Sequence, residues 1–105
     1  MLTLAVPTAD GSGAAQTFSG GWATIYLTGT FDSGTCTLQA SDDGTNYVTV
    51  LDQFGDAIAL TANGYKIFAL AGPVSLRVTL SGSSASTAVV CHVRDGWAAT
   101  RDREF

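Results

Sequence analysis

The residues best suited to chemistry lie in the segment SDDGTNY, residues 41–47. Two adjacent carboxylates, Asp42 and Asp43, precede Gly44, and the amide of Asn46 follows. Oxygen ligands of this kind suit calcium, but a calcium loop needs several more of them at alternating positions. Asp-Gly between two strand-like segments is also a strong hairpin signal, because glycine adopts the positive φ of a tight turn. We therefore predict a hairpin turn here, with no metal ion or other cofactor.

His92 is the only histidine of the chain. A hydrolase would need a nucleophile and an orienting carboxylate around it, and the sequence contains no G-x-S-x-G elbow. A zinc site would need further ligands beside the imidazole. Cys36 and Cys91 do not supply them, because the alternation of the sequence assigns both to inward faces of distant strands. We predict a surface or interface histidine, no catalytic residues, and a protein that is not an enzyme.

The two cysteines are predicted to be small buried apolar residues. They could also form a disulfide between two sheets, as in immunoglobulin domains. Those domains carry a tryptophan between the two cysteines, whereas Trp22 and Trp97 both lie outside the pair. Synthesis in a cytoplasm also disfavours the bond. We expect two reduced thiols.

Trp22 and Tyr26 lie on one side of an alternating segment, with Thr24 between them. Aromatic rings in such a row could stack on sugar rings. They are also enriched at protein interfaces, and an N-terminal segment could cover them. We favour an interface, or packing under the N-terminal segment, over sugar binding.

The composition describes one small domain with few charges. Of its 105 residues, 13% are charged, about half the share of a typical globular domain. A net charge of −4 with only five Lys and Arg residues leaves no dense basic footprint for nucleic acid. No apolar run approaches a membrane span, and the first residues do not read as a secretion signal. We expect no nucleic-acid or membrane partner, and a surface this poor in charge favours a subunit of an assembly.

Apolar residues recur at every second position through most of the chain, which is the pattern of half-buried strands. Turn sequences such as DDGTN, ANGY and SGSSAS separate the alternating segments. The alternating segments cover residues 2–6, 22–28, 35–41, 46–52, 56–61, 65–70, 74–81 and 86–94. We predict an all-β fold, a single antiparallel β-sandwich of seven or eight strands, either jelly-roll or immunoglobulin-like.

The two ends differ in composition from the middle. Residues 1–105 are predicted to form one domain with its core in residues 22–94. Residues 1–21 are predicted to be an N-terminal arm or edge strand followed by a loop rich in small residues. Residues 95–105 are predicted to be a C-terminal tail, rich in charged and aromatic side chains.

Two stretches carry a family resemblance: GTFDSGTCTLQASDDGTNYVTV at 29–50 and SLRVTLSGSSASTAVVCHV at 75–93. They resemble small β-rich virion proteins of tailed bacteriophages, most of all capsid decoration (cement) proteins. In those proteins a strand ending in S-x-D-G leads into a strand that begins with an aromatic residue. A later L-R-V-x-L-S-G strand precedes the last one. The resemblance covers residues 22–93.

The resemblance implies a structural role on the outer surface of the capsid, after synthesis in the cytoplasm of a bacterial host. The partners it implies are the major capsid protein and further copies of the chain, as a homotrimer that reinforces the shell. LTLAV, residues 2–6, could add as a strand to a neighbour, and the tail could insert its aromatic side chains into pockets. A tail or neck subunit and a carbohydrate-binding module displayed on the virion are the alternatives. The predicted interface residues are Leu2, Leu4, Trp22, Tyr26, Arg94, Trp97, Arg101, Arg103 and Phe105.

Overall fold

The computed structural model describes residues 2–84 and 86–94. Within this part the chain forms ten β-strands and no helix. The strands are β1 (Leu2–Leu4), β2 (Gly11–Ser12), β3 (Gln16–Phe18), β4 (Gly21–Thr30), β5 (Thr35–Ser41), β6 (Val48–Thr49), β7 (Ala59–Leu60), β8 (Gly64–Leu70), β9 (Val74–Ser81) and β10 (Ala88–Arg94).

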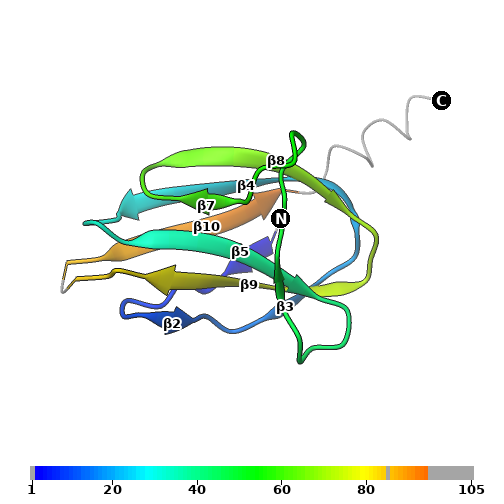
Figure 1. The fold of residues 1–105 in the computed structure, drawn as a ribbon, viewed down its shortest axis with the longest axis horizontal. Coiled ribbons are helices and arrows are strands. Elements are labelled where there is room, and N and C mark those ends of the chain that lie inside the picture. Colours follow the sequence, from blue (N-terminus) through cyan, green and yellow to red (C-terminus); the bar gives the residue numbers. More distant parts are fainter. Residues whose placement is uncertain (1, 85, 95–105) are drawn as a thin grey trace.

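The strands form two antiparallel sheets that pack face to face (Figure 1). The first, called sheet A, has the order β1-β10-β4-β8. The second, called sheet B, has the order β2-β9-β5-β6, with β3 also paired to β9 and β7 also paired to β5. The prediction of an all-β antiparallel sandwich is confirmed.

The strand order distinguishes between the two predicted types of sandwich. In an immunoglobulin domain the last two strands are neighbours in one sheet. Here β9 lies in sheet B, while β10 lies between β1 and β4 in sheet A. If β2 with β3, and β6 with β7, are each taken as one interrupted strand, the eight strands lie in chain order in sheets A, B, A, B, B, A, B and A, as in a jelly roll. The fold is therefore jelly-roll-like.

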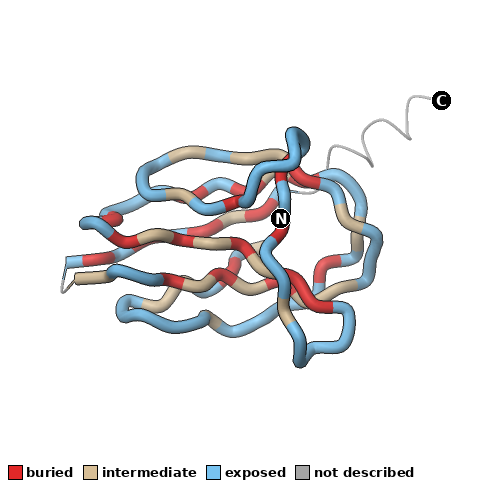
Figure 2. The backbone as a smooth tube through the Cα atoms, viewed as in Figure 1, coloured by how far each residue is buried: buried red, intermediate tan, exposed pale blue. Residues whose placement is uncertain are grey.

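Alternate side chains of the central strands fill the space between the sheets, and Figure 2 shows buried and exposed residues alternating along them. On β4 the residues Ala23, Ile25 and Leu27 are all buried, as the period of two predicted. The rings of Phe18, from sheet B, and Phe68, from sheet A, have centroids 5.7 Å apart. One continuous core therefore joins the sheets.

The N-terminal residues form an edge strand that belongs to the sandwich, which is one of the two predicted possibilities. Leu2 pairs with Val93 and Leu4 with Cys91. Leu4 is only 1% exposed, so its side chain belongs to the core of this chain and has no surface to offer a partner. The side chain of Gln16 donates a hydrogen bond to the carbonyl of Thr3. Residues 2–4 are therefore not a free arm that could add to a neighbour.

Cys36 and Cys91 are both free and completely buried, as predicted. Burial raises the pKa of both thiols, and that of Cys91 reaches about 12 because the neighbouring Cys36 adds to the effect of burial. A thiol in this state is a poor nucleophile.

We expect neither thiol to react with a disulfide reagent at pH 8 while the protein is folded, and both to react after denaturation. A colorimetric thiol count with and without guanidinium measures this. Rapid reaction in the folded protein would contradict the burial. Absence of reaction after denaturation would mean that the cysteines are joined.

Candidate functional site

The acidic loop between β5 and β6 is a hairpin turn, as predicted. Oδ1 of Asp43 accepts hydrogen bonds from the backbone N–H groups of Asn46 (2.9 Å) and Thr45 (2.8 Å) and from the hydroxyl of Ser41 (2.8 Å). These donors hold the pKa of Asp43 well below its usual range. Gly44 supplies a φ of +79°. Among the described residues no three His, Cys, Asp or Glu side chains gather as a metal site would require.

The outer face of sheet B is polar. Thr37 of β5 lies opposite Thr79 of β9, and both are half-buried. Nε of Arg77 donates to Oε1 of Gln39 at 2.9 Å, and its guanidinium carbon lies 3.7 Å from the centroid of the Tyr47 ring. Arg77 and Tyr47 therefore contact each other on this face.

The outer face of sheet A carries exposed aromatic rings instead. Trp22 and Tyr26 of β4 are 43% and 40% exposed, and Tyr65 of β8 is 61% exposed. Tyr26 and Tyr65 are directly opposite each other in the register, with ring centroids 5.7 Å apart and ring planes tilted by 32°. We call Trp22, Tyr26 and Tyr65 the aromatic strip. It is the most prominent candidate for a functional site in the described chain.

Polar side chains lie beside the rings of the strip. Thr24 stands between Trp22 and Tyr26 on β4 and pairs with Ile67 of β8. On its other side Thr24 pairs with Arg94, and Tyr26 pairs with His92, both on β10. Because residues directly opposite each other in an antiparallel sheet share a face, Arg94 and His92 flank the strip. His92 is therefore at the outer surface, as predicted.

A loop of residues 51–57, which we call the Phe54 loop, is held by one buried carboxylate. Oδ1 of Asp52 accepts from the N–H groups of Asp56 (3.0 Å) and Phe54 (2.9 Å). Its Oδ2 lies 3.3 Å from Nζ of Lys66 on β8, and the Asp52 side chain is only 1% exposed. The N–H group of Asp56 is the largest influence on the pKa of Asp52 and lowers it; burial opposes this, and Phe54 and Lys66 also lower it.

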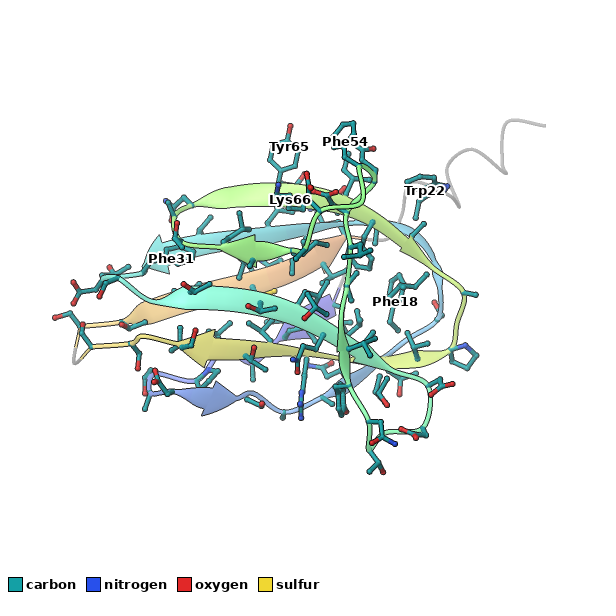
Figure 3. The ribbon with its side chains drawn as sticks, in the orientation of Figure 1. Phe18, Trp22, Phe31, Phe54, Tyr65 and Lys66 are labelled. Atoms are coloured by element: carbon teal, nitrogen blue, oxygen red, sulfur yellow. The ribbon has the colours of Figure 1, made fainter. Side chains whose placement is uncertain are left out.

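The Phe54 loop closes the edge of sheet A. The N–H group of Gln53 donates to the carbonyl of Ile67 at 2.9 Å, so the loop leaves sheet B and docks on the outer edge of β8. Phe54, at its tip, is 79% exposed. Figure 3 shows Phe54 and Tyr65 projecting from the same side of the molecule, away from Phe18 in the core.

An open groove lies between the aromatic strip and the Phe54 loop. Its larger part has a volume of about 450 Å³ and is lined by Trp22, Thr24, Gln53 and Ile67. A smaller part of about 240 Å³ shares Gln53 and Ile67 and continues to Tyr65, Phe54 and the Asp52–Lys66 pair. The groove therefore combines apolar walls with a hydroxyl and an amide, as small-ligand sites do.

Each edge strand of sheet A accepts one hydrogen bond from elsewhere in the described chain. The side chain of Gln16 donates to the carbonyl of Thr3 on β1, and the N–H group of Gln53 donates to the carbonyl of Ile67 on β8. Because an unpaired strand edge is the usual template for strand addition, these bonds disfavour strand addition at Thr3 and Ile67.

The structure brings some of the predicted interface residues together. Trp22, Tyr26 and Arg94 share the outer face of sheet A. Half-buried Leu2 pairs with buried Val93 and packs against the core, so it faces inward and not towards those three residues. Leu4 lies in the core. The remaining predicted residues lie outside the described part of the chain: Trp97, Arg101, Arg103 and Phe105.

Sequence reasoning missed the groove residues contributed by β8 and the Phe54 loop. Tyr65 and Ile67 alternate with inward-facing Phe68, so the period of two already assigned them to an outer face. Phe54 and Gln53 belong to a turn sequence, QFGD. Nothing in that sequence indicates that the loop leaves its own sheet and docks on the other.

Replacing Asp52 by alanine is expected to lower the melting temperature by several degrees and to release the Phe54 loop. The change leaves the N–H groups of Phe54 and Asp56 and the ammonium of Lys66 without their acceptor. Differential scanning calorimetry and amide hydrogen exchange of the loop measure both effects. Asp56→Asn, in the same loop, is the matched control and should change neither. An unchanged melting temperature in Asp52→Ala would contradict the role of this carboxylate.

Asp43 should make the turn between β5 and β6 sensitive to acid. Folding lowers the pKa of Asp43 from 3.8. The contribution of its carboxylate to the stability of the fold is therefore complete when the pH is above the unfolded pKa, and it is lost as the pH falls below that value. The difference in melting temperature between the protein and Asp43→Ala should therefore be constant from about pH 5 to 8 and shrink below about pH 4. Asp42→Ala is the control. A difference that stays constant down to pH 2 would contradict the proposed hydrogen bonds.

No helix in the described chain is long and apolar enough to cross a membrane. Comparisons with protein-family models, with curated proteins and with solved structures found no match. What the site does is therefore argued from its own residues: the aromatic strip, its polar neighbours and the groove.

Proposed function

We propose that this protein is a structural subunit of a tailed-phage virion that decorates the outer surface of the capsid as a cement protein. The proposal begins from the sequence resemblance at residues 29–50 and 75–93. The observation that carries it further is the position of the chain ends. Leu2 of β1 pairs with Val93 next to the last described residue, Arg94, so both ends leave the sandwich at the same end of sheet A.

This arrangement suits a protein in which the sandwich attaches to a partner through residues 95–105, which we call the tether. The two sheets share one core, and Gln16 and Gln53 each donate one hydrogen bond to an edge strand of sheet A. Residues 95–105 follow Arg94 in the sequence and include Trp97, Phe105 and two arginines. Aromatic anchors and arginine–carboxylate pairs are typical of strong protein contacts.

In the proposed mechanism the protein bridges capsid subunits mechanically and carries out no reaction. Trp97 and Phe105 enter pockets of the major capsid protein, and Arg101 and Arg103 pair with its carboxylates. A homotrimer at the positions where capsid subunits meet repeats these contacts, and multivalency turns weak individual contacts into firm attachment. Nucleic acid and membrane are not partners in this mechanism.

A tail or neck subunit is the second structural possibility, and it differs in assembly. Such a subunit would form larger rings, whereas a cement protein of the proposed kind forms trimers. Size-exclusion chromatography with light scattering should give a mass near three times the 10.8 kDa of the chain. A larger ring would assign the protein to the tail or neck.

Deleting residues 95–105 should leave the sandwich folded and weaken binding to purified shells by at least about tenfold, since a buried aromatic anchor contributes about 2 kcal/mol or more. Circular dichroism checks the fold and co-sedimentation with the shells measures binding. Trp97→Ala with Phe105→Ala should reproduce most of the loss, and Ala99→Ser in the same segment should not. A folded truncated chain that binds as tightly as the full chain would overturn the proposed tether.

A further inference from the structure

The geometry of the aromatic strip suits stacking on a chain of rings. Tyr26 and Tyr65 form a broad platform across two strands, and Trp22 lies four residues from Tyr26 on the same face of β4. Four residues along a strand span about 13 Å, comparable with two or three sugar units. The faces of aromatic rings are electron-rich and attract weakly positive C–H groups, which line the faces of pyranose rings.

Polar groups lie where a sugar would need hydrogen-bond partners. The hydroxyl of Thr24 and the amide of Gln53 line the groove beside Trp22, and the imidazole of His92 lies across from Tyr26. Aromatic rings thus alternate with hydrogen-bond donors and acceptors. The larger part of the groove, about 450 Å³, lies within the range of roughly 300–1,000 Å³ typical of small-ligand sites.

The charge of this face points to an anionic ligand. The four strands of sheet A contain no aspartate or glutamate, although the chain carries a net charge of −4. Arg94 is exposed and lies opposite Thr24, within reach of the groove. Asp52 and Lys66 both line the smaller part of the groove, but the Asp52 side chain is only 1% exposed and is paired with Lys66. The other carboxylate of the Phe54 loop, Asp56, is not among the lining residues. A carboxylate bound here would meet Arg94 and no acidic side chain of the sheet.

We propose that the outer face of sheet A is a binding site for an anionic saccharide, a chain of sugar rings that carry carboxylates. Its rings stack on Trp22, Tyr26 and Tyr65, its hydroxyl groups bond to Thr24 and Gln53, and its carboxylate pairs with Arg94. The Phe54 loop forms the wall of the site. This proposal goes beyond the virion function and does not depend on it.

A second copy of the chain is a poorer occupant of this face. A two-fold contact would place the face against itself, which brings two Arg94 side chains together and supplies no carboxylate from either sheet A. Like charges across an interface disfavour association. The alternation of rings with hydroxyl and amide groups also suits the many hydroxyls of a saccharide better than the apolar centre of a protein interface.

The test is a titration of the full chain with hexagalacturonate and, separately, with neutral cellohexaose. Calorimetry and tryptophan fluorescence measure binding in each titration. We expect tighter binding of the acidic hexamer, weakened by salt. Trp22→Ala should lower its affinity about tenfold and Trp22→Phe much less, because a ring remains. Arg94→Gln should remove most of the preference for the acidic hexamer and leave binding of the neutral one unchanged.

The opposite face supplies matched controls. Arg77→Gln and Tyr47→Ala remove the same kinds of side chain from sheet B and should not change binding.

Absence of binding to either hexamer by the folded protein would overturn the proposal. Equal binding of both hexamers, unaffected by Arg94→Gln, would overturn the anionic specificity. If Trp22→Ala weakens attachment to shells while no saccharide binds, the face belongs to a protein partner. Loss of shell binding on deletion of residues 95–105 is a separate result and tests only the tether.

Discussion

The burial of every second side chain between the two sheets is the constraint on which the rest of the structure depends. On β4, Ile25 and Leu27 are completely buried, and the period of two then places Trp22 and Tyr26 on the outer face. A slip of one residue in the register would bring these rings inward and expose the core residues, at a large cost in free energy. The aromatic strip is therefore exposed because the core requires it.

The Asp52 carboxylate has a comparable role for the groove. A charged side chain that is only 1% exposed would destabilise the fold without partners. Here the N–H groups of Phe54 and Asp56 and the ammonium of Lys66 surround it. The same contacts hold a loop from sheet B on an edge strand of sheet A. This buried carboxylate, paired with Lys66, thus links a loop from sheet B to β8 and lines the groove.

The contrast between the two outer faces connects the structure with the proposed functions. On sheet B, Arg77 contacts Gln39 and Tyr47, and the other outward pairs of β5 and β9 consist of threonine and serine. On sheet A, Arg94 lies at the surface beside the rings. A decoration protein with a tether at one end and a ligand face on its body would use these features separately, so the two proposals, attachment and saccharide binding, are independent of each other.

The sequence by itself determined the all-β class, the inward faces of the long strands and the hairpin at Asp43, because period-two alternation and turn chemistry are local. It also placed Trp22, Tyr26 and His92 at the outer surface by the same alternation. It left open the choice between jelly roll and immunoglobulin-like order, and it did not show that Leu4 enters the core. Only the tertiary structure decided that β10 lies between β1 and β4, that Tyr65 faces Tyr26, and that the Phe54 loop docks on β8. These features depend on pairing between residues far apart in the chain, which local patterns do not specify.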